Sequence, residues 1–194
     1  IAVDGVSALP VLDLDFTQVD SVYFSVQKCF GLPAGLGVWI VSPRAIKKAA
    51  EKLALGHSIG SYQALPNLLK NGLKLQTTFT ANVLNIFLLA KVSRDMLEKG
   101  IDVIRRESDY KAALLNHLVE NHPKLEHFVS DRKLRSRMIT VANTTGDSSK
   151  ILESLAQKGF VLGNGYGAYK NKQIRIASFP THSKEQMELL VDVI

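Results

Sequence analysis

Lys28 is the residue of this chain whose surroundings best suit covalent chemistry. It follows the β-branched and aromatic run of residues 22–26, and its neighbours Val26, Cys29 and Phe30 are apolar. An ammonium among apolar side chains is poorly solvated, which favours the uncharged and nucleophilic amine. Such a lysine is a candidate for forming a Schiff base with a carbonyl compound. The alternative is a lysine whose stem crosses apolar surface and whose ammonium reaches solvent.

A carboxylate stands at the end of the preceding strand-like segment. Asp4 closes a short apolar run, and a connection with a second strand-like segment separates it from Lys28. An aspartate and a lysine at consecutive strand ends suit pyridoxal phosphate, because the lysine holds the cofactor's aldehyde and the aspartate keeps the pyridine nitrogen protonated. The two residues therefore indicate a cofactor site at a strand edge.

Arg175 is a third candidate, because it lies inside the apolar segment of residues 174–178. A buried guanidinium without an anionic partner is costly, so we expect Arg175 to have one. Its planar fork suits bidentate binding of an amino-acid carboxylate. The alternative is a structural ion pair with a carboxylate of the protein itself.

Four segments resemble the active-site region of one enzyme family. They are VDGVS at residues 3–7, SVQK at residues 25–28, GLPAGLGVWIVSP at residues 31–43 and RIASFP at residues 175–180. Together they resemble the class V, fold-type I pyridoxal-phosphate aminotransferases, and within that family the phosphoserine aminotransferases. The resemblance extends over nearly the whole chain, and the Gln-Lys pair followed by a glycine-rich turn is a specific signal.

The resemblance implies an α/β fold in two parts. Residues 1–100 would form the end of the large cofactor-binding domain, a mixed sheet flanked by helices. Residues 101–194 would form a small α+β carboxy-terminal domain with its lead-in helix. The family's other cofactor contacts precede the aspartate strand, at which this chain opens without a methionine. We therefore expect the carboxy-terminal half of a longer protein, weak or inactive by itself.

The resemblance also implies roles for individual residues. Lys28 would bind pyridoxal phosphate and act as the catalytic base, Asp4 would contact the ring nitrogen, and Gln27 would donate to the phosphate. In the family a later segment crosses the dimer interface. Gln76 and Thr77 would accordingly contact the phosphate held by the neighbouring subunit of a homodimer.

By the same resemblance, Arg175 would bind the α-carboxylate of the substrate. The implied reaction is transamination between phosphoserine and 2-oxoglutarate in serine biosynthesis. Many phosphoserine enzymes carry a His-Arg pair shortly before this arginine, whereas this chain has Ala168 and Tyr169 there, with Lys170 and Lys172 nearby. Serine or alanine with glyoxylate or pyruvate therefore stays open as the substrate pair. Rivals from other classes are a lyase or desulfurase on this fold and a non-catalytic interaction protein.

The apolar pattern predicts where helices and strands lie. Ser42 is placed to cap a helix over residues 44–55, residues 57–72 are expected to be irregular, and Thr80 would cap a largely buried helix over residues 83–100. An amphipathic helix follows over residues 101–121, with Lys111 on its polar face. The remaining expected elements are strands at residues 22–26, 38–41, 138–142, 160–162 and 174–178 and helices at residues 147–158 and 183–193.

Composition favours a soluble, cytoplasmic protein. The chain is 46% hydrophobic and 22% charged, and no apolar run is long enough to span a membrane. Its single cysteine excludes an internal disulfide and fits a reducing compartment. The net charge of +6 comes from scattered basic residues without interleaved aromatics, so nucleic acid is not an expected partner. The acids Asp13, Asp15 and Asp20 lack the glycine and distal glutamate of a calcium loop, so no metal is expected.

Overall fold

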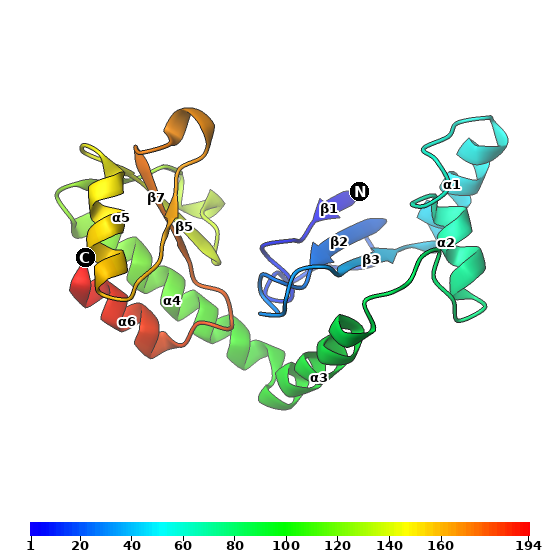
Figure 1. Cartoon of the computed structure of the whole chain (residues 1–194), viewed down its shortest axis with the longest axis horizontal. Coiled ribbons are helices and arrows are strands. Elements are labelled where there is room, and N and C mark those ends of the chain that lie inside the picture. Colours follow the sequence, from blue (N-terminus) through cyan, green and yellow to red (C-terminus); the bar gives the residue numbers. More distant parts are fainter.

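The computed structural model describes all of residues 1–194 and contains two separate sheets (Figure 1). The first sheet lies in residues 1–100, which we call the amino-terminal region. The second lies in residues 101–194, the carboxy-terminal region. Helices α1 (Pro43–Ala54) and α2 (Leu65–Gly72) lie at the end of the molecule opposite the second sheet. None of the helices combines the length and the apolar character that crossing a bilayer requires.

The first sheet has three strands in the order β1-β2-β3, which span Ala2–Asp4, Ser21–Ser25 and Gly37–Val41. Strands β1 and β2 are parallel, whereas β3 returns antiparallel to β2 after the glycine-rich turn. The carboxyl ends of parallel strands meet at one edge of a sheet. Asp4 at the end of β1 and Lys28 just after β2 therefore belong to the same edge, as the sequence predicts.

The second sheet is antiparallel in the order β4-β5-β7-β6, with bounds Leu125–His127, Ile139–Thr144, Gln173–Ala177 and Gly163–Asn164. Helices α4 (Ile101–Asn121), α5 (Ser148–Gln157) and α6 (Lys184–Val193) pack beside it (Figure 1). Ile174 and Ile176 are buried against these helices, so Arg175 between them points to the opposite face. The buried core is Leu115, Val119, Leu125, Ala142, Leu155, Ile174, Ile176, Met187 and Leu190.

Two features join the regions in addition to the ion pairs Arg105–Asp13 and Lys99–Glu107. Helix α3 (Val83–Lys99) meets α4 at Gly100, whose φ of 88° is in the range that favours glycine. A second contact is a group of buried side chains drawn from both regions, which we call the junction cluster. Its members are Val11, Cys29, Ile104, Met138 and Phe179.

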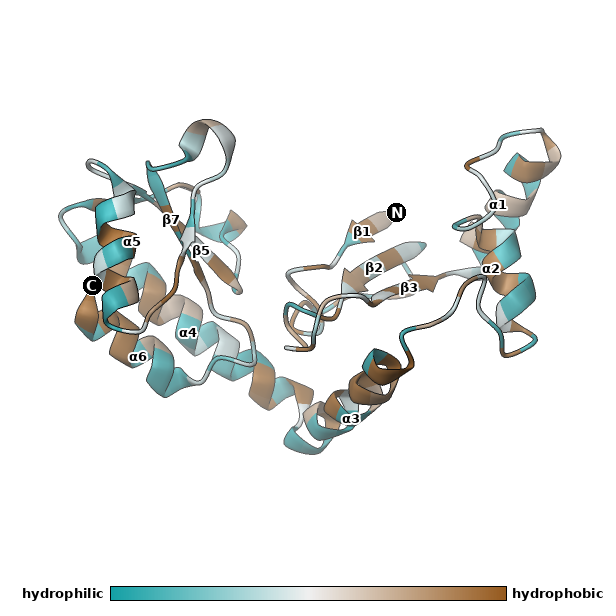
Figure 2. Ribbon diagram, viewed as in Figure 1, coloured by the Kyte–Doolittle hydropathy of each residue, from teal (hydrophilic) through white to brown (hydrophobic).

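Several expectations about individual elements were wrong. Helix α3 is not largely buried, because Asn85 is its only buried residue. Its exposed apolar side chains are Val83, Leu84, Ile86, Phe87 and Leu97. Figure 2 shows much of α3 in brown although it lies at the edge of the molecule. Its cap is Asn82 rather than Thr80, since the Asn82 side chain accepts a hydrogen bond from the Asn85 amide at 3.1 Å. Ser42 does cap α1, accepting from the Ala45 amide at 3.1 Å.

Two other segments differ from the sequence interpretation. Residues 57–72, expected to be irregular, contain α2, which begins with Pro66 in its first turn where no amide donor is needed. The strand expected at residues 160–162 lies instead at Gly163–Asn164, where the absence of a side chain on Gly163 lets the backbone approach Arg175. Strand β4 and the 3₁₀ turns at Arg132–Leu134 and Gly167–Tyr169 carried no clear pattern in the sequence.

Candidate active site

Lys28 lies in the tight turn that follows β2 and is half-buried. Its carbonyl accepts a hydrogen bond from the Gly31 amide at 3.0 Å, and its ammonium lies 5.9 Å from the centroid of the Phe179 ring. Gly31 has a φ of 64°, and a Cβ there would lie 2.3 Å from Thr181. The Lys28 turn is therefore pressed against residues 179–181 of the carboxy-terminal region.

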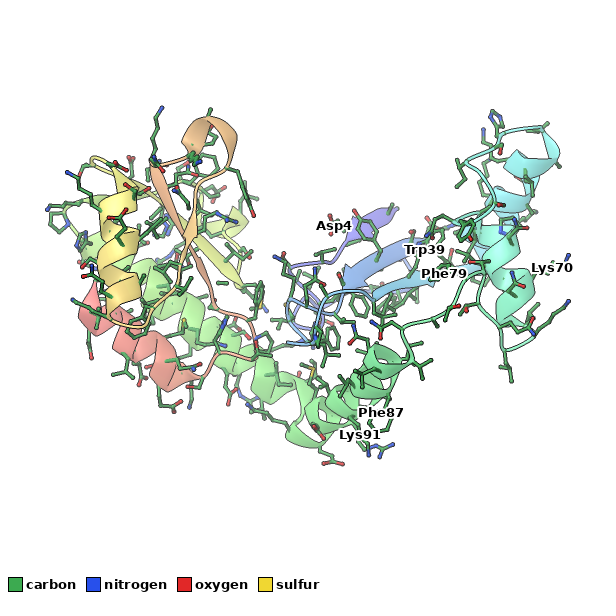
Figure 3. All side chains as sticks on the ribbon, in the orientation of Figure 1. Asp4, Trp39, Lys70, Phe79, Phe87 and Lys91 are labelled. Atoms are coloured by element: carbon green, nitrogen blue, oxygen red, sulfur yellow. The ribbon has the colours of Figure 1, made fainter.

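Asp4 is exposed at the end of β1, and Figure 3 shows it on the central sheet. One carboxylate oxygen accepts a hydrogen bond from the Val6 amide at 3.0 Å, which orients the group. The facing residue in β2 is Tyr23, and a hydrogen bond to the Asp4 carboxylate raises the pKa of that phenol. No cation of the protein neutralises Asp4, so its charge is available to a positively charged group of a ligand.

Gln27 is exposed beside Lys28. Its amide oxygen accepts the Ser25 hydroxyl, which fixes the orientation of the amide. The amide nitrogen has no acceptor in the protein and can donate to a phosphate oxygen. Gln27 therefore has the free donor that its expected role requires.

Gln76 and Thr77 lie apart from these residues. Both are exposed in the loop between α2 and α3, at the end of the molecule away from β7 (Figure 1). The backbone N–H of Gln76 donates to the Asn71 carbonyl, and the Thr77 hydroxyl donates to the Phe79 carbonyl. Their protein contacts are therefore local. The chain does not bring them to its own Lys28.

Arg175 is half-buried in β7 and forms no ion pair, since no carboxylate lies within 4.0 Å. The structural ion pair considered from the sequence is therefore absent. The guanidinium donates from Nε to the Asn164 carbonyl at 2.5 Å and lies 3.8 Å from the centroid of the Tyr166 ring. It lines a cavity of about 280 Å³ together with Phe160, His182 and others. The Nη donors have no acceptor in the protein.

Lys111 is a residue that the sequence interpretation misplaced. It was assigned to the polar face of its helix, but it is only 1% exposed. Its ammonium donates to the carbonyls of Phe179 and His182, each at 2.7 Å, and burial lowers its pKa. The sequence pattern that could have indicated its burial is the helical spacing of Ile104, Ser108, Lys111 and Leu115, all of which are buried.

Lys111 thus holds the turn that connects two of the candidate residues. Strand β7 carries Arg175 and continues through Ser178 to Phe179, whose ring lies over Lys28. The same turn presents His182, whose ring stacks on Phe179 with centroids 6.0 Å apart. The candidate site therefore spans both regions of the molecule.

The family model for "Aminotransferase class-V" matches residues 1–178 of this chain. The chain belongs to the class V aminotransferase family. A phosphoserine aminotransferase from Nocardioides sp. is 31% identical over 193 residues, which cover 98% of this chain and 52% of that relative. A putative phosphoserine aminotransferase from Mycobacterium leprae is 28% identical and is matched over 52% of its length. The chain thus spans about half the length of these relatives.

Solved aminotransferase structures also superimpose on this class V aminotransferase chain. A phosphoserine aminotransferase from Cytophaga hutchinsonii is 48% identical and superimposes with a TM-score of 0.92, covering 98% of this chain and 53% of that one. An aspartate aminotransferase from Thermus thermophilus, 22% identical, superimposes with a TM-score of 0.82 over 98% of this chain and 52% of its own. The second match shows the shared fold. The α/β architecture expected from the sequence, as a portion of the pyridoxal-phosphate aminotransferase fold, is confirmed.

Proposed function

We propose that this chain belongs to a pyridoxal-phosphate-dependent aminotransferase. The observation that carries the proposal is the placement of Asp4 and Lys28 at the same edge of the first sheet. Lys28 also lies 5.9 Å from the ring of Phe179, which follows the strand of Arg175. The bound cofactor supplies an electron sink, which makes the hydrogen on the substrate α-carbon acidic. The chain's residues supply binding, orientation and proton transfer.

Three residues would hold the cofactor in this proposal. Lys28 would bind its aldehyde carbon, and the Lys28 amine, when not bound to the cofactor, would carry the proton to and from the substrate α-carbon. The exposed Asp4 carboxylate holds the proton on the pyridine nitrogen. Gln27 donates its free amide nitrogen to a phosphate oxygen. No cation of the protein pairs with Asp4 and no protein acceptor takes the Gln27 amide nitrogen, which fits these roles.

Arg175 would bind the substrate α-carboxylate. Its Nη donors are free, and the planar fork can form two parallel hydrogen bonds with a carboxylate. Because Arg175 has no internal ion pair, binding an anion would not require breaking one. This residue would fix the substrate in the orientation that the proton transfer needs.

The arrangement of subunits is also part of the proposal. Gln76 and Thr77 lie in the loop between α2 and α3 and have only local protein contacts, and we assign them to the phosphate site of a second subunit in a homodimer. The exposed apolar side chains of α3 include Val83 at 70%, Leu84 at 64% and Phe87 at 56%, a surface consistent with such contact. Figure 3 shows Phe87 and Lys91 at the outer side of α3. We further propose domains at residues 1–100 and 101–194 and a cytoplasmic location.

For the substrate pair we propose phosphoserine and 2-oxoglutarate, as in serine biosynthesis. The support is that the relatives quoted above are named phosphoserine aminotransferases. One observation favours a second candidate, serine or alanine with glyoxylate or pyruvate. Tyr169 lies where many phosphoserine enzymes carry a His-Arg pair. It packs edge-on against Phe128 with ring centroids 5.1 Å apart and offers no positive charge. If phosphoserine is the substrate, binding of its phosphate would depend on the exposed Lys170 and Lys172.

A desulfurase mechanism through the cysteine of this chain is disfavoured by the site. Cys29 is fully buried in the junction cluster, and burial raises the pKa of its thiol to about 12. A desulfurase needs a thiolate that can reach the cofactor. Cys29 is a packing residue, because its thiol is not ionised at neutral pH and is not accessible to a cofactor.

Reductive trapping tests the proposal. The protein at its natural length is mixed with pyridoxal phosphate, reduced with borohydride and mapped by peptide mass. We expect the pyridoxyl group on the Lys28 peptide of the wild type and no labelled peptide in Lys28→Ala. Amino-group transfer is then measured with phosphoserine, serine and alanine as donors. Labelling elsewhere, or equal labelling of Lys28→Ala, would overturn the cofactor assignment.

A further inference from the structure

Tyr166 covers the guanidinium of Arg175. The centroid of its ring lies 3.8 Å from Arg175 Cζ, within the range of a cation–π contact. Tyr166 itself is 73% exposed, so its ring contributes little to the buried core. An exposed tyrosine whose ring contacts a half-buried arginine with free donors calls for a role beyond packing.

The guanidinium also lies against the backbone of strand β6. A Cβ on Gly163 would lie 2.9 Å from Arg175 Nη2, so the guanidinium lies directly against this glycine. The neighbouring Asn164 carbonyl accepts the Nε hydrogen at 2.5 Å. Arg175 is therefore held by β6 and by the Tyr166 ring, while its Nη donors stay free.

The turn that carries Tyr166 is itself well fixed. The Asn164 side-chain oxygen accepts from the Gly165 amide at 2.7 Å and from the Asn171 amide at 2.8 Å. Its side-chain nitrogen donates to the Asn171 oxygen at 2.8 Å, which closes the turn at its base. A Cβ on Gly165 would lie 2.1 Å from the Tyr169 carbonyl, so the turn can be this tight only with glycine there. The ring of Tyr166 is thus presented to Arg175 by an ordered turn.

We propose that Tyr166 is a positioning residue that orients Arg175 for bidentate binding of a carboxylate. The inference rests on the proposed function, which makes Arg175 the carboxylate-binding residue. An arginine side chain loses much rotational freedom on binding an anion, and a ring that already restricts it reduces that loss. The ring contact also leaves the positive charge unneutralised, whereas an acidic neighbour would compete with the substrate.

The role predicts an effect on carboxylate affinity and little effect on the proton-transfer step. Tyr166→Ala removes the ring, whereas Tyr166→Phe keeps it. The matched control is Tyr169→Ala, because Tyr169 belongs to the same turn but contacts Phe128 instead of Arg175. With the holoprotein at its natural length, we expect Tyr166→Ala to raise KM for phosphoserine about three- to tenfold, the size of a partly exposed cation–π contact, with kcat nearly unchanged.

A binding measurement separates this role from general damage to the site. Ligand-observed NMR titrations would compare propionate with its uncharged analogue propionamide. We expect Tyr166→Ala to weaken propionate binding about three- to tenfold and to leave propionamide unaffected, with Tyr166→Phe and Tyr169→Ala resembling the wild type. Unchanged propionate affinity in Tyr166→Ala, or an equal loss in Tyr169→Ala, would overturn the inference.

The variant Arg175→Leu tests the role of Arg175 separately from the role of Tyr166. If Arg175→Leu abolishes propionate binding while Tyr166→Ala does not change it, Arg175 keeps its proposed role and only the role of Tyr166 is wrong. If Arg175→Leu also leaves propionate binding unchanged, the carboxylate assignment and the inference that rests on it both fail.

Discussion

The two sheets of this molecule differ in what covers them. The β4–β7 sheet packs on α4, α5 and α6 around nine buried apolar side chains. In the amino-terminal region, α1 and α2 have no buried residue, and Tyr23 and Trp39 form an exposed cross-strand pair on the β1–β3 sheet. Both sheets nevertheless carry candidate site residues.

This difference indicates how Lys28 is positioned. The junction cluster places Cys29, the neighbour of Lys28, against Ile104, Met138 and Phe179. Lys28 is therefore fixed by the well-packed carboxy-terminal region as much as by its own sheet. We infer that the carboxy-terminal region acts as the rigid support of the site, and this inference can be tested by weakening each region separately.

The largest expected effect comes from the core of the carboxy-terminal region. Leu115 is 0% exposed in α4, whereas Leu53 in α1 is 48% exposed. We expect Leu115→Ala to lower the free energy of unfolding by about 2–5 kcal/mol, because it leaves a cavity. The matched change Leu53→Ala is expected to cost less than about 0.5 kcal/mol. Urea unfolding of both variants measures these free energies. Equal losses would contradict the inference that the carboxy-terminal region is the better packed of the two.

A smaller effect is expected at the turn that carries Phe179, because this residue contributes to the contact between the regions. Lys111→Met leaves the carbonyls of Phe179 and His182 without their donor, and each lies in a buried or partly buried position. We expect a loss of about 1–3 kcal/mol in the free energy of unfolding. The control is Lys99→Met, which removes only an exposed ion pair with Glu107 at 2.6 Å and should cost less than about 1 kcal/mol.

Cys29 reports on the same contact. Its thiol is buried and its pKa is raised to about 12, so native protein should react very slowly with a thiol reagent at neutral pH. In Lys111→Met the turn of Phe179 loses its attachment, and we expect faster labelling of Cys29 by stopped-flow absorbance. The same labelling rate in Lys111→Met and Lys99→Met would show that Lys111 does not hold the junction cluster closed.

The contrast between the regions also explains which predictions from the sequence were correct. Strands β2 and β3 were predicted because their β-branched runs are bounded by glycine and proline, a local signal. The apolar density of α3 indicated burial, but density alone does not show that another part of this chain covers the helix. Lys111 was misplaced for a similar reason, since only the packing of α4 against the turn at residues 179–182 decides which stripe of the helix is inside. The ring of Tyr166 depends on a turn closed by Asn164 and Asn171, which no periodicity reveals.

The smallest expected effect is a pH dependence located at the junction of the regions. Burial, and to a lesser degree the Lys111 ammonium, lowers the pKa of His182 below its ordinary value of 6.5. Its Nδ1 atom is buried without a hydrogen-bond partner, so protonation would place an unpaired N–H there. The folded state then binds fewer protons than the unfolded state below pH 6.5, and the free energy of unfolding falls as pH decreases from 6.5 toward the lowered pKa.

His182→Phe removes this proton and keeps a ring against Phe179. We expect the wild type to lose stability relative to His182→Phe as pH falls from about 7.5 to about 5.5, with a slope of at most about 1.4 kcal/mol per pH unit for one proton. Urea midpoints at several pH values measure the difference. Burial also lowers the pKa of His127, but that residue is present in both proteins and cancels. Parallel stability curves would mean that His182 is solvated in the intact protein and that the turn at residues 179–182 is looser than its contacts with Lys111 and Lys28 indicate.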